Sequence, residues 1–128
     1  MAQLAAIGIV TADIADSCRF YRALGLDVPE PPVGDDHFDL ELPNGLRLMW
    51  DKESLIKQLY PDWRRPEGGT ALALAFECGS PSEVDETYRR VVDVGFRGKK
   101  EPYDAFWGQR YANVVDPDGN VVDLFAAL

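Results

Sequence analysis

The sequence lacks long apolar runs and an excess of basic residues. No apolar run is long enough to span a bilayer, and we expect neither a membrane segment nor a signal peptide before Ala2. Lysine and arginine number 13 against 22 aspartate and glutamate residues, which gives a net charge of −9. Nucleic-acid-binding proteins need a basic face, so we expect no nucleic acid and no membrane as partners. The acidity is compatible with a cationic small molecule, although it more often serves solubility.

Cysteine is also scarce. Cys18 falls in a predicted helix and Cys78 in a predicted strand, which favours two structural thiols in a reducing compartment over a disulfide. We therefore expect a cytoplasmic protein. Neither cysteine has an adjacent base, and no serine or cysteine has the sequence context of an activated nucleophile.

The chain has a single histidine, His37, near the start of a predicted strand. A neighbouring carboxylate raises the pKa of a histidine, so Asp35 or Asp36 could activate His37 as a base. The alternative, which we favour, is a hydrogen-bonding histidine at the surface or at the rim of a pocket.

What the sequence does contain is an internal repeat. Residues 107–125 place two β-rich runs around Asp-Pro-Asp-Gly-Asn, a strong turn signal, and predict a C-terminal hairpin. Residues 42–48 repeat this strand, turn and strand pattern around Pro43, which lies 74 residues before Pro117. A repeat at that spacing indicates two similar halves, and a duplicated fold places its site between them.

Two predicted helices repeat with nearly the same spacing. Asp13 is a good N-cap for an amphipathic run over residues 14–24, which Gly25 ends. Residues 80–83 form a capping box with proline at the first helical position, and this second helix ends at Gly95. The two glycines are 70 residues apart, so the helices belong to the same repeat as the hairpins.

Each helix follows an apolar run, residues 4–10 in the first half and residues 71–78 in the second. Each half is therefore predicted to form a strand, a helix and then two or three strands. The third strand of the first half has the weakest support, because residues 28–33 contain three prolines and only an edge strand could form there. The prediction is one α+β domain, with a first module over about residues 1–60, a linker over about 61–69 and a second module over about 70–128.

This order of elements resembles the vicinal oxygen chelate superfamily. The resemblance rests on FYRALGL at residues 20–26, LAFE at residues 74–77 and DPDGN at residues 116–120. The group includes glyoxalase I, ring-cleaving dioxygenases, fosfomycin-resistance enzymes and bleomycin-binding proteins. The resemblance implies two tandem βαβββ modules that form a curved mixed sheet with the helices on its outer face. It also implies that a second subunit usually completes the fold, so we expect a homodimer.

The resemblance implies that the residues at four positions decide whether this chain can bind a metal. Most enzymes of the superfamily hold a divalent metal through His, Gln or Glu on the first and last strands of each module. Here those positions align with Ala6, Met49, Ala73 and Asp123. Alanine cannot bind a metal and a thioether is a poor ligand for a hard cation, so we expect no metal, no cofactor and no catalytic residue. The alternative, a glyoxalase-like or fosfomycin-transferase-like metalloenzyme, needs a different alignment in both modules.

Aromatic residues gather at predicted strand ends and loops. The loop over residues 103–108 carries three rings, and exposed rings that no core requires usually mark a binding surface. In bleomycin-binding relatives a Trp-Gly just before the same strand lines the drug groove, and Trp107 with its following glycine matches it. Trp63 lies in the linker, which in such folds crosses near the mouth of the cavity. Alternatively, Trp50 and Phe106 pack between the modules or across a dimer interface.

Strand alternation predicts the floor of this groove. Val121, Asp123 and Phe125 share one face of the last strand, and the ligand position of the family faces the concavity. We therefore expect Asp123 in the groove, with Met49 as its counterpart in the first module. The alternative is that Asp123 is a structural acceptor for strand-end amides or for Arg110.

The sequence therefore predicts a metal-free protein that sequesters a small aromatic natural product or antibiotic for self-resistance, like the drug-binding members of the superfamily. Bleomycin, enediyne, anthraquinone and mitomycin types are candidate ligands by resemblance. A structural or regulatory module is a third interpretation, favoured if Trp63 and Trp107 are buried away from any cavity. The expected ligand-binding residues are His37, Phe38, Met49, Trp50, Trp63, Tyr103, Phe106, Trp107 and Asp123.

Overall fold

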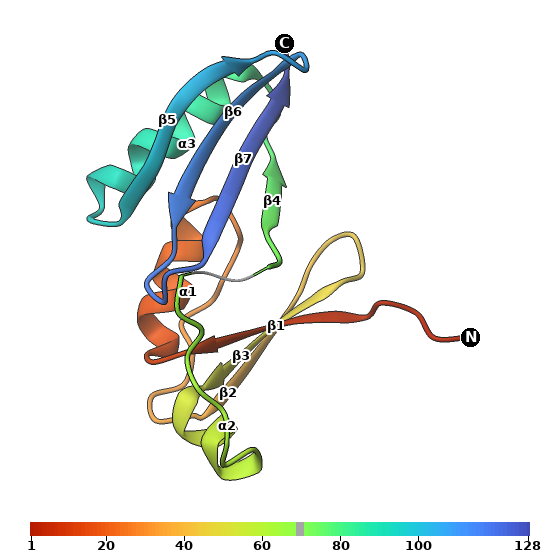
Figure 1. The fold of residues 1–128 in the computed structure, drawn as a ribbon, viewed down its shortest axis with the longest axis vertical. Coiled ribbons are helices and arrows are strands. Elements are labelled where there is room, and N and C mark those ends of the chain that lie inside the picture. The colour runs from red at the N-terminus through yellow and green to blue at the C-terminus, as the bar shows by residue number, and fades with distance from the viewer. Residues whose placement is uncertain (69–70) are drawn as a thin grey trace.

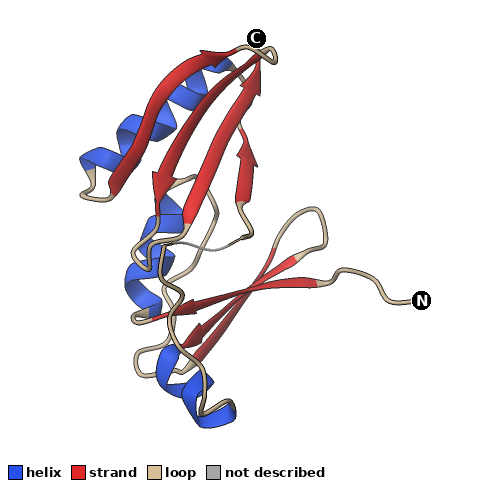
Figure 2. Cartoon of the chain, in the orientation of Figure 1, coloured by secondary structure: helices blue, strands red, loops and turns tan. Residues whose placement is uncertain are grey.

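The computed structural model describes residues 1–68 and 71–128 of an α+β chain. Each half places a helix against one face of a mixed sheet (Figure 1, Figure 2). Among the described residues, no helix is long and apolar enough to cross a lipid bilayer. The first half contains β1 (Ala6–Thr11), α1 (Ile14–Ala23), β2 (His37–Glu41), β3 (Arg47–Lys52) and α2 (Glu53–Leu59), and the second contains β4 (Leu74–Glu77), α3 (Pro81–Asp93), β5 (Arg97–Ala105), β6 (Gln109–Val115) and β7 (Val121–Ala127).

The two sheets repeat one topology. Their strand orders are β1-β3-β2 and β4-β7-β6-β5. In each sheet the first strand of the module runs parallel to the last strand, β1 beside β3 and β4 beside β7. The remaining neighbours, β2 with β3, β5 with β6 and β6 with β7, are antiparallel. The predicted duplication of a strand, helix and strands unit is therefore confirmed.

The first sheet has one strand fewer than the second. Residues 28–33 form a loop, so the edge strand considered for this segment does not form. Its three prolines fix φ and supply no backbone donor, which leaves too few groups for a ladder. A side chain holds the start of this loop instead, since the Arg22 guanidinium donates to the Val28 carbonyl at 2.8 Å.

The predicted helix ends are confirmed. The side chains of Asp13 and Ser80 each accept a backbone N–H from the first turn, at 3.0 and 3.2 Å. Such an N-cap stabilises a helix by about 1 kcal/mol. The chain leaves the helices through glycines with positive φ, 113° at Gly25 and 102° at Gly95, a conformation that glycine adopts without strain.

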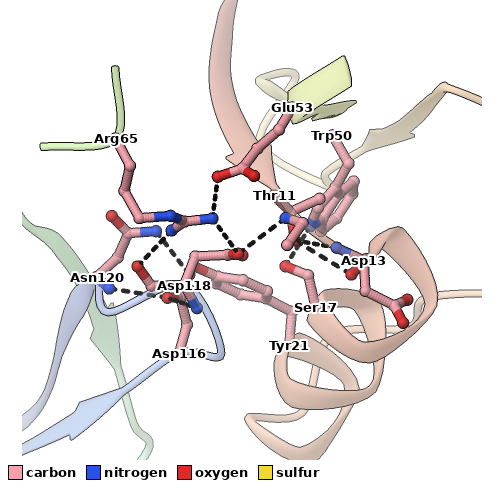
Figure 3. Close-up of polar contacts among 11 residues, drawn as sticks. Thr11, Asp13, Ser17, Tyr21, Trp50, Glu53, Arg65, Asp116, Asp118 and Asn120 are labelled. Atoms are coloured by element: carbon pink, nitrogen blue, oxygen red, sulfur yellow. Dashed lines mark hydrogen bonds and ion pairs between the residues drawn. The ribbon is translucent and has the colours of Figure 1, made fainter. Parts of the chain in front are cut away.

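One hydrophobic core joins the two halves. At its centre the ring of Tyr21 contacts those of Phe20 and Trp50, with centroids 4.9 and 5.9 Å apart. All three rings are fully buried. Trp50 Nε1 donates to Ser17 Oγ at 3.0 Å (Figure 3), so the polar atom of the indole is satisfied inside the core.

A polar cluster fastens α1 and the linker to the turn between β6 and β7 (Figure 3). The backbone N–H of Ala12, just before α1, donates to Asp118 Oδ1 at 3.0 Å. Arg65 of the linker donates to the Asp118 carbonyl at 2.9 Å and forms an ion pair with Glu53 of α2. These contacts fix the second module against the first.

Candidate functional site

The second sheet has one face in the core and one face that no helix of the described residues covers. Ala112 and Val114 of β6 and Val122 and Leu124 of β7 are buried in the core, on the side where α3 packs (Figure 1). Side chains alternate along a strand, so the intervening residues point the other way. We call this second surface the open face; its residues are Lys100, Tyr103, Trp107, Tyr111, Asn113, Asp123 and Phe125.

Aromatic rings lie together on the open face, around Tyr111. The Tyr111 ring centroid lies 5.4 Å from that of Trp107 and 6.3 Å from those of Tyr103 and Phe125. Phe106 extends the cluster at the tip of the β5–β6 hairpin, 5.0 Å from Trp107. Phe106 is 98% exposed and Trp107 is 50% exposed. The cluster therefore presents aromatic surface on which a planar molecule can stack.

Two side-chain donors fix the Asp123 carboxylate beside this cluster. The Tyr111 hydroxyl donates to Oδ2 at 2.6 Å, and Asn113 Nδ2 donates to Oδ1 at 2.5 Å. Burial, followed by the hydrogen bond to Asp123 and its charge, raises the pKa of Tyr111 to about 12, so the phenol remains a donor at neutral pH. Arg110, considered as a partner of Asp123, instead pairs with Asp85 of α3 at 2.9 Å. The carboxylate is thus an oriented acceptor on the open face.

The four positions that the sequence aligns with the metal ligands of the superfamily offer a donor set that does not fit a metal. Ala6 begins β1, Met49 lies on β3 and Ala73 precedes β4. Two methyl groups and a thioether cannot complete the coordination of a hard divalent cation. The remaining carboxylate, Asp123, is already held by two side-chain donors. Among the described residues, no three His, Cys, Asp or Glu side chains are arranged to bind a metal ion.

His37 lies on the first sheet between two carboxylates. Its Nδ1 is 2.5 Å from Asp51 Oδ1, and its Nε2 is 2.7 Å from Asp39 Oδ1. The hydrogen bond to Asp51, and after it the bond to Asp39, raises the pKa of His37. The raised pKa favours the protonated ring, in which both nitrogens are donors. In the described structure, Asp35 and Asp36, considered as its activating partners, do not hydrogen-bond to the ring.

The structure explains why the sequence did not reveal the hydrogen-bond partners of His37. Asp39 lies two residues further along β2, and Asp51 is the residue opposite His37 on β3. Residues two apart share a face, and directly opposite residues are neighbours. The i+2 spacing is visible in the sequence, whereas the cross-strand neighbour requires the register of β2 against β3.

Two of the predicted ligand-binding residues lie on the core side of the first sheet. Trp50 is fully buried, and Phe38, opposite it on β2, packs against it with ring centroids 5.9 Å apart. We correct both assignments. Trp50 and Met49 are adjacent on β3, and because side chains alternate along a strand, Trp50 points into the core when Met49 points to the opposite face of the sheet. Trp63 lies half-buried in the linker, where its backbone N–H donates to the Tyr60 carbonyl at 2.9 Å.

The two main hollows of the described residues lie away from the open face. The hollows, of about 420 and 370 Å³, lie on the helix side of the molecule. One is bordered by α1 and the β6–β7 turn, and the other by α3 and β5. Neither is lined by Tyr111 or Asp123. Binding sites usually bury most of the ligand surface, so a ligand on the open face needs a second surface to cover it.

Known proteins share this architecture. The model of the Glyoxalase/Bleomycin resistance protein/Dioxygenase superfamily matches residues 3–124. A family enzyme from Burkholderia phytofirmans PsJN superposes with a TM-score of 0.81 at 19% identity, covering 99% of this chain and 100% of that one. A glyoxalase/bleomycin resistance protein/dioxygenase from Nocardioides gives 0.76 at 27% identity, with coverage of 100% and 85%.

A glyoxalase-related enzyme from Fulvimarina pelagi gives a TM-score of 0.80 at 22% identity, covering 98% of this chain and 88% of that one. A search of curated proteins gave no significant match. The likenesses below 25% identity establish the fold, whereas the superfamily model spans nearly the whole sequence. The chain therefore belongs to the glyoxalase/bleomycin resistance protein/dioxygenase superfamily.

Proposed function

We propose that this chain is a metal-independent binding protein that sequesters a flat aromatic molecule on the open face. The observation that carries the proposal is the cluster of Tyr103, Trp107, Tyr111 and Phe125 on the same face as Asp123. Stacking adds about 0.5–1.5 kcal/mol per aromatic pair beyond the burial of apolar area. The carboxylate, held by β6, supplies an acceptor for one polar edge of the ligand.

The donor chemistry supports binding over metal-assisted catalysis. A glyoxalase-like or fosfomycin-transferase-like enzyme needs several oxygen or nitrogen ligands around one ion. Ala6, Met49 and Ala73 provide none at the positions where related enzymes have them. The Tyr111 phenol, whose pKa is raised to about 12, stays protonated at neutral pH, and both ring nitrogens of His37 are already engaged by carboxylates, so neither group is well placed to act as a base.

We further propose that the chain is a homodimer in which a second copy covers each site. In the described part of the chain, β1 and β4 each have a strand partner on one side only. Such edges attract further strands, and an uncovered aromatic sheet face attracts an apolar surface. Light scattering should give about twice the 14.3 kDa of one chain, whereas the monomer mass at micromolar concentration would contradict the proposal.

The biological role that fits these features is self-resistance in the cytoplasm. A protein that binds without transforming its ligand protects by lowering the free concentration of a toxic aromatic compound. Bleomycin-, enediyne-, anthraquinone- and mitomycin-type molecules are the classes to test first. The two free thiols, Cys18 and Cys78, fit a reducing compartment.

Tryptophan fluorescence tests this function directly. A panel of planar aromatic compounds, including anthraquinones and acridines, is titrated into the protein and into Trp63→Phe and Trp107→Phe variants. We expect saturable quenching that survives in Trp63→Phe and falls sharply in Trp107→Phe, because Trp107 belongs to the aromatic cluster. If no compound quenches saturably, or if quenching depends on Trp63 alone, the open face is not the binding site.

A further inference from the structure

A bulge in β5 brings Lys100 and Tyr103 onto the same face of the sheet. Lys100 lies opposite Asn113 of β6, while Tyr103 lies opposite Tyr111, so three residues of β5 span two of β6. In a regular strand, residues three apart point to opposite faces. The extra residue reverses this alternation, and the Lys100 ammonium lies 3.9 Å from the centroid of the Tyr103 ring.

The Lys100 ammonium is held on the open face mainly by the aromatic ring. Among the described residues, no carboxylate forms an ion pair with it, whereas the guanidinium of Arg110 on the opposite face has two carboxylate partners. A cation over a ring is attracted by the electrons of its π face. Displacing this ammonium would therefore break no ion pair.

A carboxylate lies on the same face two strands away, because β6 runs between β5 with Tyr103 and β7 with Asp123. Tyr103 contacts Tyr111 with centroids 6.3 Å apart, and the Tyr111 hydroxyl donates to Asp123 at 2.6 Å. The rings and the carboxylate together form a surface that attracts positive charge, by the π face and by the Coulomb interaction. The net charge of −9 acts in the same direction at long range.

We infer that the aromatic ligand carries a cationic group, which binds on the Tyr103 ring in place of the Lys100 ammonium, on the same face as the Asp123 carboxylate. This inference rests on the proposed function, because it specifies the charge of the molecule bound there. The ligand class is a planar aromatic cation, such as one with a ring ammonium or an attached amine. Lys100 acts as an internal competitor that sets the affinity for such cations.

Two probes of matched shape and different charge test the inference. Acridine and the N-methylacridinium cation are titrated at a pH where acridine is uncharged, with binding followed by fluorescence and calorimetry. We expect the cation to bind the wild-type protein more tightly than acridine. Lys100→Met should strengthen binding of the cation by roughly two- to fivefold, the weight of one exposed cation–π contact, and leave acridine nearly unchanged.

Matched variants separate the effect of the Lys100 position from the general effect of removing one positive charge. Lys99→Met removes the same charge from the neighbouring exposed residue of β5 and should change the affinity for the cation much less than Lys100→Met. Asp123→Asn and Tyr103→Leu should reduce the preference for the cation, while Tyr103→Phe, which keeps a ring, should largely retain it. Melting temperatures of all variants establish that the changes in affinity come from folded protein.

The failures of the inference and of the proposed function are distinguishable. Equal binding of both probes, unaffected by Lys100→Met, overturns the cationic ligand and leaves aromatic binding intact. Preference for an anionic probe, acridine-9-carboxylate, that disappears in Lys100→Met shows that Lys100 is instead an anion receptor. If none of the probes binds the wild-type protein, the proposed function itself fails for this ligand class.

Discussion

The hydroxyl of Tyr21 in α1 donates to the carboxylate of Asp116 at 2.9 Å, although the two residues are 95 positions apart in the sequence (Figure 3). Both side chains are buried. Asp116 also accepts the backbone N–H groups of Asp118 and Asn120. The turn over residues 116–120, which marks the repeat in the sequence, therefore also connects the second module to α1 of the first module through a buried hydrogen bond.

Removing the Tyr21 hydroxyl oxygen tests how much this hydrogen bond contributes to stability. Tyr21→Phe should lower the free energy of unfolding by about 1.5–3 kcal/mol, the range for a hydrogen bond to a charged group, because the buried carboxylate loses a donor. Urea unfolding measures the change. Tyr88→Phe is the matched control, since among the described residues no hydrogen bond of its hydroxyl is seen, and it should change stability much less. Equal effects of the two variants would show that the Tyr21 hydroxyl contributes little.

The pKa of His37 should be raised and should depend on Asp51. Because His37 is the only histidine, its ring protons give one unambiguous NMR titration curve. Asp51→Asn should lower the His37 pKa clearly, whereas Asp36→Asn, which changes a nearby carboxylate outside its hydrogen bonds, should lower it little. The reverse order would assign the shift to the residues that the sequence suggested.

The same shift predicts a direction for stability against pH. A raised folded-state pKa means that the contribution of His37 is fully present below its unfolded-state pKa of about 6.5. It is lost as the pH rises through the higher pKa of the folded protein. Stability measured from about pH 6 to about pH 9 should therefore fall less in His37→Gln than in the wild type. An identical slope in both proteins would contradict this assignment.

The parts of the fold that sequence predicted are those set by local chemistry. Asp13, Ser80 and the turn at residues 116–120 were predictable because a cap or a turn depends on a few adjacent residues. Helix α2 was not, since it has no side-chain N-cap and none of its residues is buried. The site was harder to predict, because it depends on which side chains of each strand point to the same face and on the register between neighbouring strands.

Particular residues show this limit at the site. Trp50 and Met49 are adjacent, and the sequence alone does not say which of them faces the core. The sequence placed Tyr103 in a loop over residues 103–108, whereas it lies within β5, and its contact with Lys100 depends on a bulge. Bulges depend on the pairing of two strands, so composition and spacing in one strand do not reveal them.

Purified protein should contain well below one divalent metal ion per chain. The reason is the donor set at Ala6, Met49 and Ala73, which leaves Asp123 without partner ligands. Elemental analysis of untagged protein for zinc, nickel, manganese and iron makes the measurement. Stoichiometric metal, removed by a chelator together with an enzymatic activity, would instead support the metalloenzyme alternative.

Trp107 should contribute more to ligand binding than any other residue of the hairpin tip. Its indole N–H donates to Gln109 Oε1 at 2.8 Å, and its ring lies against Tyr111, so the ring is oriented before a ligand arrives. Little rotamer entropy is then lost on binding. Trp107→Ala should weaken the affinity for a planar aromatic ligand by about 2 kcal/mol or more, the size of a binding hot spot.

Phe106→Ala is the matched variant, because Phe106 is the adjacent ring and is 98% exposed, while its contact is with Trp107. It should weaken binding by a smaller amount, since it removes a neighbour of the stacking ring rather than the ring itself. Neither variant should lower the melting temperature much, because both side chains are substantially exposed. If Trp107→Ala instead lowers the melting temperature or dissociates a dimer while affinity per folded protein is unchanged, Trp107 is an interface residue and the ligand binds elsewhere.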